Sequence, residues 1–331
     1  MNYLTEKELK KFGKTFSLSK RTIALVNQQR SHWELAGTNY QLLREIQTRT
    51  FQFGHFRIDC QHNPGRIKST GAQTESMIRD PGNCFLCEHN RPSDQAGIAF
   101  GNDFTILCNP YPIFPSHLTI TANDHIPQKI CGNLRRYLQM IQQLNEFVVF
   151  YNGARCGASA PHHLHFQAGI RDVLPIEEEL PDLLTDFSEE IFSGNGMVIR
   201  SCERYFRHFV YFSSADESLM AKHLERALEL AGEQKQEDEP LLNLLGWFND
   251  GHWEIILFLR HKLRPDEYFA EENNRLMVSP ASVEMGGLMI LPREDDFNQI
   301  TAAQLESVFR QVSIQDVDFN IFKNKLKNGI N

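Results

Sequence analysis

The spacing of apolar residues along the chain predicts a mixture of helices and strands. Leu42, Leu43 and Ile46 lie at helical spacing near the end of a helical segment of about 50 residues. Runs rich in β-branched and aromatic residues predict strands between these helices. Helices are expected over 134–148, 218–233 and 240–248 and from 301 onward, and strands over 51–60, 104–107, 118–121, 147–151, 206–212, 253–260 and 286–292. The pattern predicts a fold that mixes helices and strands in both halves of the chain.

One short pattern occurs twice. Tyr151-Asn152-Gly153 precedes a histidine-rich stretch, and Phe248-Asn249-Asp250-Gly251 precedes the apolar run 253–260. A repeated pattern of this kind is typical of a duplicated unit. The second copy in this chain lacks a His-x-His sequence. We therefore expect an N-terminal helical segment (1–50), a half that carries the histidines (51–195) and a second half without them (196–331).

The histidine-rich stretch 157–169 contains the strongest chemical signal. Side chains alternate between the two faces of a strand, so His163, His165 and Gln167 share one face. Leu164 and Phe166 share the other face, which is expected to pack against the core, together with His162. A register built on His162 and His165 would break this alternation. The His-x-His-x-Gln face would then line a cleft, with His165 as a nucleophile.

Composition limits the possible functions. The chain has 331 residues, which suggests about two domains, and a net charge of −8, which argues against a nucleic-acid groove. The N-terminus lacks the apolar segment of a signal peptide, and no apolar run approaches the roughly 18 residues that would cross a membrane. The seven cysteines, an odd number, favour reduced thiols in a cytoplasmic protein over a disulfide framework.

Two further motifs could bind ligands. Cys84 and Cys87 form a Cys-x-x-Cys pair that can supply two of the four ligands of a tetrahedral zinc. A buried reduced pair and a thioredoxin-like redox motif are the alternatives. Arg66 follows an Asn-Pro-Gly turn, where its guanidinium could hold a phosphate or could simply be solvated.

Together these motifs resemble the transferase branch of the histidine-triad (HIT) superfamily. That branch includes galactose-1-phosphate uridylyltransferase, diadenosine tetraphosphate phosphorylase and GDP-L-galactose phosphorylase. The resemblance covers roughly residues 55–170 and rests on segments 61–66, 84–91, 109–125 and 152–167. It implies an α+β fold with a duplicated HIT-like unit, in which each half has an antiparallel sheet and flanking helices.

The resemblance also implies roles for individual residues. His165 would form a covalent nucleotidyl-histidine, Gln167 would hydrogen-bond its phosphate, and His163 would lie beside the nucleophile. Ser159 and Asn152 would contact or position the substrate, as would Arg66, and a structural zinc would be held by Cys84, Cys87, His125 and His163. This chain departs from the pattern at Ser159, which lies four residues before His163 instead of three, and at His162, which replaces a small or polar residue.

The expected activity is nucleotidyl transfer or phosphorolysis. The substrate would be a nucleoside diphosphate sugar or a dinucleoside polyphosphate, with phosphate or a sugar phosphate as acceptor, on a monomer or homodimer. Gln167 favours transfer over hydrolysis, because a neutral amide stabilises an intermediate without titrating. A HIT-type nucleotide hydrolase and a non-catalytic nucleotide-binding protein are the alternatives. A cupin-like oxygenase would need a carboxylate a few residues after the histidines, but the next glutamate is Glu177, which lies outside a plausible strand.

Overall fold

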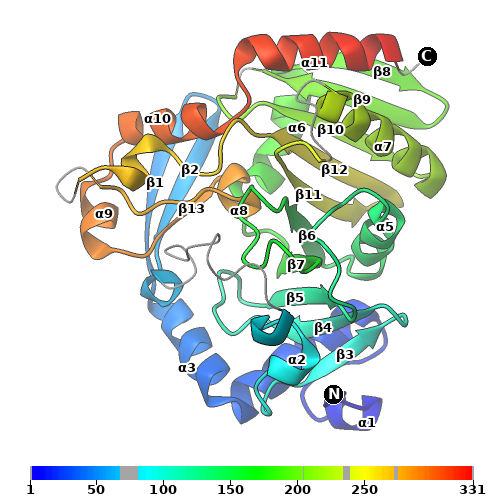
Figure 1. The fold of residues 1–331 in the computed structure, drawn as a ribbon, viewed down its shortest axis with the longest axis vertical. Coiled ribbons are helices and arrows are strands. Elements are labelled where there is room, and N and C mark those ends of the chain that lie inside the picture. Colours follow the sequence, from blue (N-terminus) through cyan, green and yellow to red (C-terminus); the bar gives the residue numbers. More distant parts are fainter. Residues whose placement is uncertain (1, 68–80, 204, 234–238, 272–274, 330–331) are drawn as a thin grey trace.

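A ten-stranded sheet organises the chain (Figure 1). The computed structural model describes residues 2–67, 81–203, 205–233, 239–271 and 275–329. Neighbouring strands of this sheet run antiparallel, in the order β3-β4-β5-β7-β6-β11-β12-β10-β9-β8. The strands are β3 (Gly97–Phe100), β4 (Phe104–Cys108), β5 (His117–Ala122), β6 (Phe147–Asn152), β7 (His165–Ile170), β8 (Ser188–Gly194), β9 (Met197–Cys202), β10 (Phe209–Ser214), β11 (Leu242–Asn249) and β12 (His252–Leu259).

The strand order contains the same five-stranded unit twice, which agrees with the predicted duplication. In each half three strands are followed by a helix and then by two more strands, and the last strand inserts between the third and the fourth. The helices are α5 (Leu134–Gln143) and α7 (Glu217–Glu233). The two units join where β6 pairs with β11, with Asn152 opposite Asn243. This topology places the start of the second unit at β8, so the predicted boundary at 195/196 falls in the turn between β8 and β9.

Helices cover one face of the sheet. α2 (Leu18–His32), α5 and α7 pack on this face, α1 (Glu6–Leu9) and α3 (Glu34–Leu42) contact α2, and α11 (Asp316–Gly329) packs on α7. A continuous apolar core lies beneath them and includes Leu164 and Phe166, as the alternation predicted.

A second layer covers the opposite face. It contains a three-stranded sheet of β1 (Gln47–Phe53), β2 (Phe56–His62) and β13 (Leu288–Leu291), with α6 (Pro175–Asp186), α8 (Ser282–Met285), α9 (Glu294–Gln299) and α10 (Ala302–Val312). Figure 1 shows this layer across the sheet from α5 and α7. α10 begins with a capping box in which Thr301 and Gln304 satisfy each other's backbone N–H groups. The second layer provides another apolar core.

Three predicted elements differ from the structure. Residues 240–248 are not a helix but β11, whose Leu242–Trp247 segment is buried on both faces and therefore shows no alternation. The predicted strand 51–60 is a hairpin with a turn at Gly54, so β1 begins inside the segment predicted as helical up to residue 50. The helix predicted to reach 148 ends at Gln143, and Phe147 already belongs to β6.

Among the described residues, none of the helices combines the length and apolarity needed to cross a bilayer. All seven cysteines are free thiols, and six of them are buried.

Candidate active site

The connection from β6 to β7 carries most of the predicted site. It spans residues 153–164 and ends at His163 and Leu164, directly before β7. Gly157 in this connection has a φ of +99°, and a Cβ there would lie 2.5 Å from Cβ of Ala281. Only glycine therefore allows the connection to approach the second half so closely. This contact joins the two halves at the site.

His165 begins β7 and is almost completely buried. Its Nδ1 lies 2.8 Å from the carbonyl oxygen of His163, which can only accept, so Nδ1 carries the proton. Nε2 is buried and has no hydrogen-bond partner among the described residues, and its lone pair is available to a ligand. Burial lowers the pKa of His165 to about 4, which keeps the imidazole neutral at neutral pH.

A neighbouring histidine fixes the orientation of Gln167. The backbone N–H of Ile113 donates to Nδ1 of His117, so the proton of this neutral ring lies on Nε2. Nε2 then donates to Oε1 of Gln167 at 3.1 Å, and Asn109 contributes a longer bond of 3.4 Å. Burial lowers the pKa of His117 to about 3. The amide oxygen of Gln167 is thus engaged, and its NH2 group is available to donate.

Both halves line a cavity of about 500 Å³ around His165. The predicted residues Arg66, Asn152, Ser159, His165 and Gln167 all lie on its wall. Phe85 and Leu86, between the two predicted zinc-binding cysteines, also line it, as do Tyr111 and Leu107. The second half contributes Leu263, Arg264, Ser279, Ala281, Val283 and Glu284. The structure therefore brings the predicted substrate-binding and catalytic residues together, with His163 just outside the wall.

The residues from the second half were missed by the sequence analysis. They lie in segments without a recognisable motif, and nothing local in the sequence distinguishes them from ordinary loop residues. Arg264 donates from Nε to Ser279 at 3.1 Å, and its guanidinium lies over the ring of Tyr268. It adds a positively charged side chain from the second half to the cavity wall.

Arg66 and Glu284 place opposite charges on the cavity wall. Arg66 donates from Nη1 to the carbonyl oxygen of Tyr111 at 3.0 Å. Burial lowers its pKa, and the charge of Glu284 opposes this effect. The carboxylate of Glu284 is itself buried and accepts a bond from the backbone N–H of Ala281. Arg66 is half-buried on the cavity wall, and its contact with a phosphate stays a prediction.

The four predicted zinc ligands form one cluster. The ligand atoms of Cys84, Cys87, His125 and His163 all lie within 4.8 Å of one another. Sγ of Cys84 lies 3.3 Å from Nδ1 of His163, and Sγ of Cys87 lies 3.1 Å from Nδ1 of His125. A tetrahedral zinc with two sulfur and two nitrogen ligands needs edges of about 3.3–3.8 Å. These residues fit a metal ion, which would supply a closed structural site.

The protonation of His163 also fits metal binding. Nε2 donates to the carbonyl oxygen of Ala122 at 2.9 Å, so the lone pair of Nδ1 points toward the two sulfurs. The ring of His162 packs against His125, with ring centroids 5.1 Å apart, and does not share the core face of Leu164.

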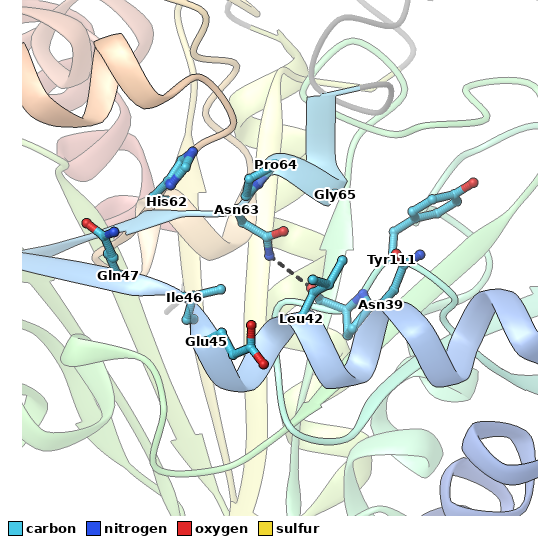
Figure 2. A pocket seen from close by; sticks show the side chains of 11 residues that line it. Asn39, Leu42, Glu45, Ile46, Gln47, His62, Asn63, Pro64, Gly65 and Tyr111 are labelled. Carbon is cyan, nitrogen blue, oxygen red and sulfur yellow. Dashed lines mark hydrogen bonds between the residues drawn. The ribbon is translucent and has the colours of Figure 1, made fainter.

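A smaller cavity of about 290 Å³ is lined by the end of α3, the start of β1 and the turn that contains Asn63, Pro64 and Gly65 (Figure 2). Tyr111 lines both cavities. Asn63 donates to the carbonyl oxygen of Pro112 at 3.1 Å, which ties the turn 63–66 to the segment after β4. This turn therefore separates the two cavities.

The fold and the site together define a class: a duplicated antiparallel protein whose first half holds a buried histidine beside a cavity. Known family models match both halves. Residues 25–170 match the family described as "Domain of unknown function (DUF4922)", and residues 187–331 match "GDPGP1-like, C-terminal domain".

Solved structures show the same fold. A yeast Ap4A phosphorylase, Apa2, in complex with Ap4A aligns with a TM-score of 0.57 at 13% identity and covers 88% of this chain and 97% of its own. The same enzyme in complex with AMP aligns with a TM-score of 0.52 at 12% identity and covers 87% of this chain and 97% of its own. No curated protein sequence matches the chain. The chain therefore shares the fold of this yeast enzyme, which agrees with the resemblance to the transferase branch of the HIT superfamily that its motifs indicated.

Proposed function

We propose that this protein is a nucleotidyltransferase or phosphorylase that acts through a covalent nucleotidyl-histidine at His165. One observation carries the proposal: the Nε2 lone pair of a buried, neutral imidazole faces a cavity large enough for a nucleotide. The NH2 group of Gln167 lies two residues further along the same strand and can donate to a phosphate oxygen. Arg66 from the first half and Arg264 from the second half both line the cavity and supply positive charge.

The reaction would proceed in two displacements. Nε2 of His165 attacks the α-phosphorus of the bound nucleotide, and the bond from phosphorus to the bridging oxygen breaks. The leaving phosphate ester takes the electron pair, while the proton on Nδ1 stays hydrogen-bonded to the carbonyl of His163. An oxygen of an acceptor phosphate then attacks the same phosphorus, and Nε2 leaves with its electron pair restored.

The proposed substrate is a nucleoside diphosphate sugar or a dinucleoside polyphosphate. A binding partner of this kind is supported by the similar fold of Apa2, which was solved with Ap4A and with AMP. The proposed acceptor is phosphate or a sugar phosphate. Ser159 and Asn152 are proposed to contact the phosphates, because both line the cavity near His165.

The proposed metal is a structural zinc on Cys84, Cys87, His125 and His163. A zinc there would hold His163 in place, and the carbonyl of His163 orients His165. The metal would therefore act on the nucleophile through the backbone and would not touch the substrate.

Labelling with α-³²P nucleotides tests the function. The wild type is incubated with labelled Ap4A, GDP-sugars and UDP-sugars, and acid-labile label on the protein is measured. We expect label on the wild type and none on His165→Ala. The matched control is His252→Ala, which removes an exposed histidine at the start of β12 and should leave the labelling unchanged. A wild type that takes up no label from these nucleotides, or label that persists on His165→Ala, would contradict the proposal.

The acceptor is tested by a chase. Labelled protein is transferred to buffer with or without phosphate or sugar phosphates, and the products are separated. Transfer predicts that the label is stable in buffer and leaves with an acceptor. Release into water at the same rate would instead identify a hydrolase.

A further inference from the structure

The amide oxygen of Asn152 accepts hydrogen bonds from two N–H donors and lies close to the hydroxyl of Ser282, which also lies 2.8 Å from the carbonyl oxygen of Tyr151. Oδ1 accepts from the backbone N–H of Ser282 at 2.9 Å and from Nδ2 of Asn243 at 2.9 Å, and Oγ of Ser282 lies 2.6 Å away. A backbone N–H can only donate, so the atom facing Ser282 must be the oxygen of Asn152. Asn152 lines the cavity, and its NH2 group is therefore the end available to a ligand.

The orientation of Asn243 is fixed in the same way. Nη1 of Arg260 donates to Oδ1 of Asn243, and a guanidinium can only donate. The NH2 group of Asn243 is thereby turned toward Oδ1 of Asn152 and toward the carbonyl of Cys156 at 2.8 Å. Arg260 is anchored by a bond from Nε to the carbonyl of Val312 at 2.9 Å.

This chain of bonds lies in the interior. Asn243 and Ser282 are completely buried, Arg260 is 1% exposed and Asn152 is 6% exposed. Hydrogen bonds in such an environment compete little with water, and a reversed amide would face several mismatched partners. Asn243, Arg260 and Ser282 all belong to the second half, which lacks the catalytic histidines.

We propose that Asn243 and Ser282 are positioning residues that set the polarity of the Asn152 amide, so that its NH2 group donates to a phosphate oxygen of the substrate. This inference rests on the proposed nucleotidyl transfer. If Asn152 were reversed, its carbonyl oxygen would face the phosphate and repel it. By holding Asn152 in the donating orientation, the second half contributes to the reaction through the direction of one hydrogen-bond donor.

A double-mutant cycle tests this role. Asn243→Asp keeps an oxygen for Arg260 but replaces the NH2 group with an oxygen that repels Oδ1 of Asn152. We expect this variant to lower kcat/KM by about tenfold or more in the wild-type background. In the Asn152→Ala background, the same substitution should have an effect of less than about twofold, because its target is gone.

Two further variants control for folding. Ser282→Ala removes the hydroxyl donor and should show the same dependence on Asn152, with a smaller effect because the backbone donor remains. Ser201→Ala removes a similarly buried hydroxyl from β9, away from Asn152, and should leave kcat/KM unchanged. Thermal melting of each variant confirms that it is folded, and if Asn243→Asp fails to fold, the Ser282→Ala cycle decides.

The outcomes separate this inference from the proposed function. Additive losses in the cycle, or an Asn243→Asp variant with wild-type kcat/KM, would overturn the positioning role while leaving nucleotidyl transfer intact. A wild type without transfer activity would overturn the proposed function. In that case, the same four variants are compared by their affinities for AMP and GMP, measured by calorimetry. If the effect of Asn243→Asp on affinity depends on Asn152, the positioning role is supported. If the effects of the two substitutions are additive, or if the wild type binds neither nucleotide, the positioning role is rejected.

Discussion

Strands β7 and β12 occupy corresponding places in the two halves of the sheet, and each begins with a histidine. Nδ1 of His165 lies 2.8 Å from the carbonyl oxygen of His163, and Nδ1 of His252 lies 3.1 Å from that of Asp250. The local contact is the same, since each ring bonds to the residue two positions earlier. His165 is nevertheless 2% exposed beside a cavity, whereas His252 is open to solvent. A histidine at the start of such a strand is therefore not sufficient for a site.

The difference lies in the connections before the two strands. In the first half residues 153–164 separate β6 from β7 and supply His163 and Ser159, whereas a turn of Asp250 and Gly251 joins β11 to β12. The short turn leaves no chain to build a wall around His252. The longer connection reaches Ala281 of the second half through Gly157 and closes one side of the cavity.

What covers the sheet also differs between the halves. In the first half, Gln167 lies on the face of the ten-stranded sheet that is covered by the second layer. In the second half, the same face carries Tyr211, Ile256 and Phe258, which pack in the apolar core beneath that layer. Glu254 lies two residues after His252, as Gln167 lies two after His165, and it accepts a bond from the indole of Trp247. The cavity described here lies beside the histidine of the first half, whereas the corresponding face of the second half is covered mainly by apolar side chains.

The largest expected difference between the halves concerns metal binding. Cys84→Ser should lose the bound zinc and markedly lower the melting temperature, because the binding energy of a structural zinc, about 10–16 kcal/mol in zinc-finger peptides, contributes to folding. Cys202→Ser, in β9 of the second half, also replaces a buried thiol but should retain the zinc. Zinc per chain and thermal unfolding measure both. Unchanged zinc in Cys84→Ser would refute the ligand set.

Exchanging the glutamine of one half for the glutamate of the other is expected to have the next largest effect. Gln167→Glu removes the NH2 donor and adds a negative charge beside the phosphate, so nucleotidyl transfer should slow by about 10²–10³-fold. The reciprocal Glu254→Gln should leave the rate unchanged, because Glu254 faces Trp247 and does not line the cavity. Rates of transfer test the pair. Equal losses in both variants would mean that the halves do not differ in function at this position.

The smallest expected effect concerns two glycines that occupy tight packing sites. A Cβ on Gly169 would lie 2.5 Å from Cδ1 of Phe114, and a Cβ on Gly246 would lie 2.5 Å from Cδ1 of Ile141. Each change to alanine should lower the free energy of unfolding by about 1–3 kcal/mol. Only Gly169→Ala should also slow transfer, because the ring of Phe114 packs against His117, which orients Gln167. Denaturant unfolding and transfer rates separate the two effects, and an inactive but folded Gly246→Ala would contradict this assignment.

Much of the first half's chemistry could be predicted from the sequence. Strand alternation separated His163, His165 and Gln167 from Leu164 and Phe166, and the structure places the latter two in the core. The motifs of the resemblance also led to the Cys84, Cys87, His125 and His163 cluster, whose members lie far apart in the chain. Such motifs are informative because the chemistry of nucleophiles and metal ligands restricts which residue types can serve.

The tertiary structure alone decided the second half's contribution. The helix predicted over 240–248 is instead strand β11, because a strand buried on both faces loses the alternation that identifies it. Asn243 on that strand and Ser282 on α8 reach Asn152 only because β6 pairs with β11 and α8 packs on both. Hydrogen bonds between residues about 90 or 130 positions apart produce no pattern in the order of apolar and polar residues, so the sequence alone does not predict them. By itself, the sequence determined which residues could react, and the pairing of the two halves decided how their polar groups point.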